Sequence, residues 1–206
     1  MILLHTIVAS KLFREDTMNR ILTTAALAVT LAAPALAQGT FPTQHWATNT
    51  GIANIQPNST VIEEGQVADV MNIQQAFSRW GVYYDEGSSD LIPSLFTVDA
   101  TTVTYLGTDE SIADNEGHEA IATYIDSSLE GQLDQRRHVL TNFLIDELTE
   151  DTAKAMAYGT VIKAADGLSL GAMVFYSGEL EKGDDGVWKF SKLTIGIDDY
   201  AGNLSN

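Results

Sequence analysis

The chain contains no cysteine among its 206 residues. This absence excludes disulfide bonds, thiol nucleophiles and zinc sites that depend on cysteine. The sequence also contains no phosphate-binding glycine loop, nucleophile elbow or zinc signature. Packing alone must hold the fold together, and an apolar content of 45 % is sufficient for a buried core.

Basic residues are scarce, with 11 Lys and Arg against 28 Asp and Glu and a net charge of −17. This balance argues against nucleic acids and anionic membranes as partners, because binding to phosphates needs cationic side chains. The acidic segments "DESIADNE" and "KGDDG" lack the spaced glycine and final glutamate of a calcium loop. We interpret both as solvated loops, and we predict neither a metal nor a cofactor.

Long apolar runs are also missing. The segment "MNRILTTAALAVTLAAPALAQG" begins at Met18 and offers an apolar stretch shorter than the roughly 20 residues of a membrane span. Its basic start and the small residues before Gln38 are typical of a signal peptide. We predict that residues 1–37 are an upstream segment plus signal peptide, with the start at Met18 and cleavage after Ala37. A retained anchor is the alternative.

Cleavage would remove three basic and two acidic residues and leave a net charge of −18. The mature protein is therefore expected in the periplasm or the medium, without membrane contact. Residues 38–65 show no sustained periodicity and predict an extended arm or linker. The folded domain is predicted to occupy residues 66–206.

Helices are predicted first in that domain. From Gln66 onward apolar residues recur at three- and four-residue intervals, which predicts a helix ending just before Gly87. A short helix over "SDLIPSLF", a strand over "DATTVTYLG" and a third helix over "GHEAIATYIDSSLEG" follow. Four strand-like segments with short polar or glycine-bearing links then fill the chain, which is typical of hairpins. This order predicts the α+β class.

Several phrases in this order resemble a known family: "RWGVYYDEGSSDLIPSLFTVDA", "GHEAI", "RRHVLTNF" and "DGVWKFSKL". They are similar to the SnoaL-like branch of the nuclear-transport-factor-like superfamily, over about residues 66–198. The resemblance implies a cone-like barrel in which a curved, mainly antiparallel sheet wraps around the N-terminal helices. It also implies a pocket at the open end and homo-oligomers formed through the sheet face.

The phrases resemble those of hexachlorocyclohexane dehydrochlorinase and scytalone dehydratase, in which a strand histidine acts as base and a helix-end aspartate orients it. The resemblance places these roles on His138 and Asp85. Histidine suits the task because its ordinary pKa is about 6.5 and a carboxylate can fix its tautomer. Asp85 also lies in the last helical turn, where the helix dipole disfavours an anion by ~0.3–1 kcal/mol. A solvated aspartate and a structural histidine remain the alternatives.

Trp80 and Tyr84 lie one helical turn apart beside Asp85, and we predict that they shape the pocket. Tyr158 is the neutral candidate for proton transfer on the following strand. The resembling enzymes carry a tyrosine or lysine where this chain has Trp80, which donates one N–H but cannot act as an acid. The sequence therefore suggests a cofactor-free lyase or isomerase in which His138 takes a proton from a small hydrophobic, cyclic molecule. A non-catalytic binder and a dimerising module on the same scaffold are the rival hypotheses.

Overall fold

The computed structural model describes residues 42–130 and 132–200. The predicted signal peptide and the first residues of the predicted arm lie outside these ranges. No helix within the described ranges combines the length and apolar character needed to cross a membrane. The elements run in this order: α2 (Trp46–Asn49), η1 (Glu64–Gln66), α3 (Val67–Asp85), η2 (Ile92–Leu95), β1 (Phe96–Leu106), β2 (Ser111–Glu116), α4 (Gly117–Leu129), β3 (Gln135–Leu148), β4 (Thr152–Ala165), β5 (Gly167–Lys182) and β6 (Trp188–Tyr200).

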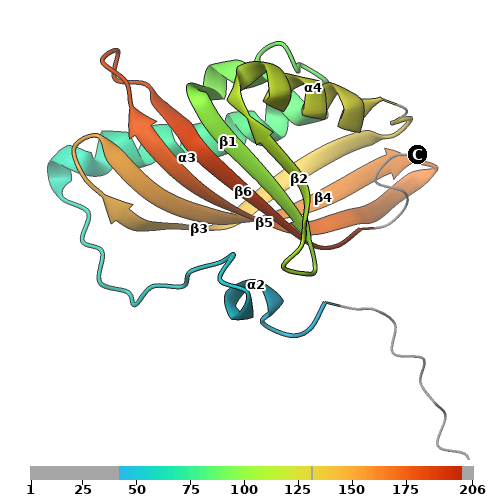
Figure 1. The fold of residues 1–206 in the computed structure, drawn as a ribbon, viewed down its shortest axis with the longest axis horizontal. Helices are drawn as coiled ribbons and strands as arrows, with labels where there is room; N and C mark the ends of the chain where they lie inside the picture. The colour runs from blue at the N-terminus through green and yellow to red at the C-terminus, as the bar shows by residue number, and fades with distance from the viewer. Residues whose placement is uncertain (1–41, 131, 201–206) are drawn as a thin grey trace, which may run out of the picture. The chain divides into compact units, whose positions relative to one another are not determined.

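The strands form one curved sheet with the order β2-β1-β6-β5-β4-β3 (Figure 1). Strands β3 to β6 are joined as consecutive antiparallel hairpins, while β1 and β6 pair in parallel. The predicted α+β class and the mainly antiparallel sheet are confirmed. The sheet is open rather than closed, because β2 and β3 each have a neighbour on one side only.

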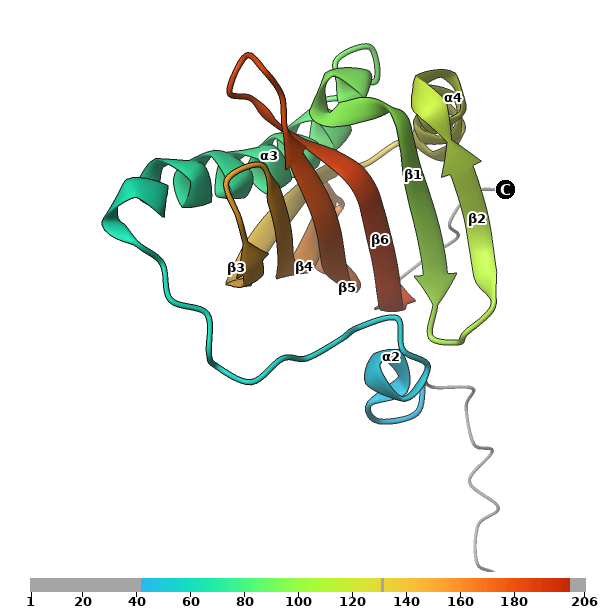
Figure 2. The same cartoon turned by 60° about the vertical axis from the view of Figure 1, so that its left-hand side comes forward.

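Three helical elements, α3, η2 and α4, pack on one face of the sheet and share a single apolar core with it (Figure 2). Helix α3 contributes the stripe that its apolar spacing predicted, including Ile73, Phe77 and Trp80. The helix ends at Asp85, and Gly87 follows with φ 64°. Glycine adopts this left-handed conformation without steric cost, so it closes the helix as predicted.

The opposite face of the sheet carries α2 (Figure 2). Trp46 is buried there against Phe175 with Ala53. The Trp46 indole N–H donates to Asp198 Oδ1 over 2.6 Å. The region predicted as an extended arm therefore contains a helical turn that is bound to the sheet.

Strand β2 corrects the prediction of an acidic loop. Residues 111–116 pair antiparallel with β1 and form one edge of the sheet. Most of their side chains are exposed. An edge strand has only one neighbour and tolerates polar and charged side chains, which is why its sequence lacks an apolar pattern.

Strand β3 contains an irregularity at Asn142, which has φ 50°. Regular alternation would place Asn142 and Leu144 on the same face as His138. Instead, both are exposed, and Phe143 turns inward to meet Phe77 with ring centroids 5.4 Å apart. The extra residue is a β-bulge, which shifts the alternation of the following side chains until a second irregularity between Ile145 and Glu147.

Candidate functional site

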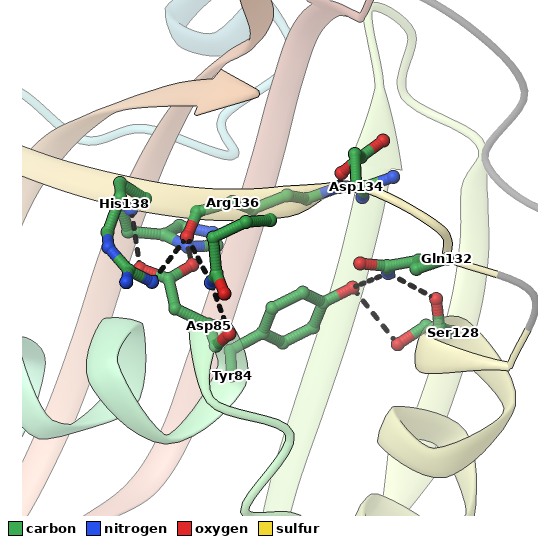
Figure 3. Close-up of polar contacts among 9 residues, drawn as sticks. Tyr84, Asp85, Ser128, Gln132, Asp134, Arg136 and His138 are labelled. Atoms are coloured by element: carbon green, nitrogen blue, oxygen red, sulfur yellow. Dashed lines mark hydrogen bonds and ion pairs between the residues drawn. The ribbon is translucent and has the colours of Figure 1, made fainter. Parts of the chain in front are cut away.

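His138 and Asp85 form a buried pair between β3 and the end of α3 (Figure 3). The His138 ring nitrogen Nδ1 lies 2.6 Å from Asp85 Oδ1. The other carboxylate oxygen, Oδ2, accepts the backbone N–H of His138 over 2.7 Å. The two side chains are only 7 % and 6 % exposed. Both oxygens of one carboxylate thus hold the same histidine, by its ring and by its backbone.

The pair meets because α3 lies very close to β3 at Gly81. A Cβ atom at Gly81 would be 3.0 Å from the Cβ of His138, so a larger residue would press against the strand. Nearby, the Gln135 side-chain amide donates to the Asp85 carbonyl oxygen over 2.9 Å. On the surface, Arg137 and Glu86 form an ion pair of 3.0 Å. A glycine inside a helix, one turn before Asp85, was the sequence signal for this approach.

The pairing determines which nitrogen is available for chemistry. Because Nδ1 faces a carboxylate, the neutral imidazole of His138 carries its hydrogen on Nδ1 and keeps a lone pair on Nε2. In the described part of the chain, Nε2 has no hydrogen-bond partner. The contact with Asp85 thereby fixes the orientation of the imidazole ring.

Aromatic side chains surround the imidazole. The Tyr84 ring lies 5.3 Å from it, edge to face, and the Tyr176 ring lies 6.4 Å from it. Trp80 is 3 % exposed, and its indole N–H has no hydrogen-bond acceptor among the described residues. A buried donor without an acceptor is unfavourable by about 1–3 kcal/mol.

Burial raises the pKa of the Tyr176 hydroxyl far above its ordinary value. The Trp80 N–H lies near enough to the Tyr176 oxygen to offset part of this rise, yet it does not reach hydrogen-bond geometry. Tyr176 therefore stays protonated at neutral pH and can act only as a neutral hydrogen-bonding group. Its place beside His138 was not predicted, because an aromatic residue on a strand is as typical of a packed core as of a functional site.

The Tyr84 hydroxyl forms hydrogen bonds with residues at and just after the end of α4 (Figure 3). It donates to Ser128 Oγ over 3.1 Å and accepts from the Gln132 side-chain amide over 3.3 Å. Tyr84 thereby connects α3 to the end of α4. Its ring, rather than its hydroxyl, is the part that contacts His138.

Tyr158 does not join the other predicted residues. It is 46 % exposed and lies in register with Thr141 and Phe175. Its neighbours in β4, Ala157 and Gly159, face the core instead. Alternation along β4 places Tyr158 on the opposite face of the sheet. The structure thus brings together His138, Asp85, Trp80 and Tyr84, and leaves Tyr158 apart.

Neither of two surface hollows in the described part of the chain is lined by His138 or Asp85. One, of about 560 Å³, lies beside β2 and α4 and includes Glu116 and Glu119. The other, of about 450 Å³, lies across α3 from the pair. Within residues 42–130 and 132–200, no group of three or more His, Cys, Asp or Glu side chains is placed to hold a metal ion.

The chain belongs to the SnoaL-like domain family, whose sequence model matches residues 65–194. The nuclear-transport-factor-like superfamily predicted from its motifs is thereby confirmed. No curated protein is similar enough in sequence to count as a relative.

Several solved structures share this fold. A protein from Catenulispora acidiphila, solved in complex with S-DNPA, is 27 % identical over 65 % of this chain and 96 % of its own, with a TM-score of 0.56. The beta subunit of a putative aromatic-ring-hydroxylating dioxygenase from Novosphingobium aromaticivorans is 17 % identical over 69 % of this chain and 96 % of its own, with a TM-score of 0.59. ActVI-ORFA from Streptomyces coelicolor is 14 % identical over 64 % of this chain and 98 % of its own, with a TM-score of 0.56.

Proposed function

We propose that the protein is a cofactor-free lyase or isomerase that acts on a small hydrophobic, cyclic molecule. His138 Nε2 takes a proton from a carbon atom of that molecule. The released electron pair then forms a double bond as a neighbouring hydroxyl or halide leaves, or it shifts within the molecule and the proton returns at another carbon. Asp85 holds the imidazole in the required tautomer throughout.

The observation that carries this proposal is the 2.6 Å contact between His138 Nδ1 and Asp85 Oδ1 in a buried setting. A solvated helix-end aspartate would not satisfy both the ring and the backbone of one histidine. The unpartnered Trp80 N–H supports the same conclusion, since it offers a hydrogen bond to an oxygen or halogen of the substrate. The Catenulispora acidiphila protein was solved in complex with S-DNPA, which is consistent with ligand binding by this fold.

The test is exchange of carbon-bound hydrogen in D2O. Molecules that co-purify with the protein would be identified by mass spectrometry and incubated with it, together with a panel of cyclic ketones, alcohols and halides. NMR would follow deuterium uptake and product formation. We expect His138→Gln to abolish both, because glutamine cannot take the proton, and Asp85→Asn to reduce the rate by roughly 10²–10⁴-fold.

His118→Gln is the matched control, because His118 lies on α4 and its Nε2 contacts the Phe96 carbonyl oxygen at 3.1 Å. This variant should retain full activity. If the wild-type protein binds a co-purifying molecule but neither exchanges its hydrogens nor changes it, the proposal of an enzyme is wrong and a binding function stands.

A second candidate function is that of a dimerising module. It is favoured by exposed apolar side chains on the face of the sheet opposite α3. By register, four apolar side chains share that face and are 40 % to 49 % exposed: Val139, Leu144, Tyr158 and Met173. We propose that two copies associate through this face. Light scattering should show a dimer that Tyr158→Glu dissociates, whereas the same change at exposed Val98 on β1 should leave the dimer intact.

We further propose that the protein is exported and works in the periplasm or the medium. The predicted signal peptide ending at Ala37 supports this. Fractionation of the producing cells and N-terminal sequencing of the mature protein would test it, and a mature chain that begins near Gln38 is the expected result.

A further inference from the structure

The hollow across α3 from the His138–Asp85 pair combines polar side chains of α3 with apolar side chains of η2 and β6. It has a volume of about 450 Å³ and lies between α3, η2 and the turn that joins β5 to β6. This volume is within the range of about 300–1,000 Å³ that is usual for small-molecule sites. Figure 2 shows α3, the β5–β6 turn and the segment before β1 on the same side of the molecule.

One stripe of α3 supplies most of the polar lining. Asn72, Gln75, Arg79 and Tyr83 follow one another at intervals of three and four residues, so they share one face of the helix. Arg79 comes two residues before Gly81, which places it on the side of the helix opposite β3. All four side chains can donate hydrogen bonds.

The cation of α3 that lines this hollow is not neutralised by a carboxylate. Within the described residues, ion pairs with acidic side chains are formed by Arg136, Arg137, Lys154 and Lys182. Arg79 has no carboxylate within ion-pair distance in that part of the chain. Lys189 also borders the hollow, but alternation along β6 turns its side chain to the face opposite the buried Trp188, in register with Glu181. Arg79 donates to the Tyr83 hydroxyl over 2.9 Å, which leaves most of its guanidinium N–H groups available.

The acidic side chain on the lining is that of Asp185, and it is already engaged. Its Oδ1 accepts the backbone N–H of Val187 over 3.0 Å and thereby shapes the turn. The hollow therefore offers the Arg79 guanidinium beside a carboxylate that is already hydrogen-bonded, in a chain whose net charge is −17. Its floor is apolar, because Leu95 and Trp188 are buried there.

We propose that this hollow binds a small organic carboxylate. The carboxylate meets the guanidinium of Arg79, and the carbon body lies against Leu95 and Trp188. Arginine binds carboxylates well because its planar N–H groups can engage both oxygens. The site is separate from His138 and does not depend on the function proposed for that residue.

The experiment is a titration of the 15N-labelled protein with benzoate at low ionic strength, followed by NMR. Benzamide, a neutral molecule of the same shape, and inorganic phosphate are titrated in parallel. We expect saturable shifts at Gly186, Lys189 and the Arg79 side chain with benzoate only. Arg79→Gln should weaken binding about tenfold, as expected for the loss of a hydrogen bond to a charged group.

Lys192→Gln is the matched control, since Lys192 is an exposed lysine of β6 that does not line the hollow. It should change the affinity less than about twofold. His138→Gln should also leave benzoate binding unchanged, which separates this proposal from the catalytic one. The NMR spectrum of each variant reports whether its fold is retained.

Any of five results would overturn the proposal. Shifts that do not saturate, or that are equal for benzoate and benzamide, would show that Arg79 holds no carboxylate. Undiminished binding in Arg79→Gln would place the ligand elsewhere, as would shifts gathered around His138. Phosphate binding as tight as benzoate binding would show that Leu95 and Trp188 do not favour an organic carboxylate over an inorganic anion.

Discussion

Helix α3 has two faces that differ in how their charges are satisfied. On the face against β3, Asp85 is buried and both of its oxygens accept hydrogen bonds from His138. On the opposite face, Arg79 is exposed and lacks a carboxylate partner within the described ranges. The proposed base requires a fixed geometry, which the burial of its partner provides. The proposed carboxylate site requires access, which the exposed Arg79 side chain retains.

The largest effect on stability is expected on the buried face. Asp85→Ala removes the acceptor of two hydrogen bonds and should lower the free energy of unfolding by about 2–4 kcal/mol. Urea denaturation followed by circular dichroism would measure it. Asp85→Asn keeps one oxygen acceptor and should lower the stability less. A loss below about 0.5 kcal/mol for the alanine variant would mean that the pair does not hold the helix to the strand.

The close approach of α3 to β3 can be tested next. Gly81→Ala adds a Cβ 3.0 Å from the Cβ of His138, which the two bonds to Asp85 hold in place. We expect it to be destabilising by about 1 kcal/mol, despite the better helix propensity of alanine. Gly65→Ala is the control, since no atom lies within 4 Å of its added Cβ, and it should be neutral or stabilising. Equal effects at both glycines would contradict the tight contact.

The first turn of α3 gives a pH-dependent comparison. Asp69 accepts from Lys182 Nζ over 2.9 Å and from the Trp188 indole N–H over 2.8 Å. The Lys182 hydrogen bond, followed by that of Trp188, holds the pKa of Asp69 below its ordinary value. A lowered pKa stabilises the fold above the ordinary pKa of about 3.9, and this stabilisation is lost as the pH falls through the lowered pKa.

Asp69→Asn should therefore reduce the free energy of unfolding by about 1–2 kcal/mol at pH 7. The difference from the wild-type protein should shrink as the pH falls below about 4. Denaturant titrations at pH 7, 5 and 3 would measure this trend. A difference that is constant across the three values would show that the charge of Asp69 contributes nothing.

The smallest effect on stability is expected on the face of α3 that carries Arg79. Arg79→Gln should change the free energy of unfolding by less than about 0.5 kcal/mol, because the side chain is exposed and no carboxylate depends on it. Thermal denaturation would measure it. A larger loss would show that Arg79 stabilises the helix, and it would weaken the contrast between the two faces.

Much of the fold was predictable because it follows from local periodicity. The apolar stripe of α3, the glycine after it and the four hairpin-linked strands were all read from residue spacing. The site depended on the resemblance, since His138 and Asp85 are far apart in the sequence and no local pattern connects them. Gly81, a glycine inside the predicted helix, indicated the close approach of α3 to another element, but the prediction did not use it.

The failures have physical causes that lie outside local sequence. Strand β2 was missed because an edge strand needs no apolar face, so its residues read as a loop. The inward turn of Phe143 depends on the bulge, which periodicity cannot locate. Tyr158 was proposed from its chemistry, yet alternation along β4 turns it away from the core. The place of Tyr176 beside His138 and the unpartnered Trp80 N–H both depend on how α3, β3 and β5 pack together, which local sequence does not show.

The bulge at Asn142 also matches the length of a segment of β3 to the length of the segment of α3 beside it. Helix α3 bears two anchors for β3: Asp85, which holds His138, and Phe77, which meets Phe143. The eight residue steps from Phe77 to Asp85 rise about 12 Å at ~1.5 Å each. The five steps from His138 to Phe143 would span about 16.5 Å in a regular strand at ~3.3 Å each. With one residue absorbed at Asn142, the strand advances only about 13 Å, which nearly matches the helix.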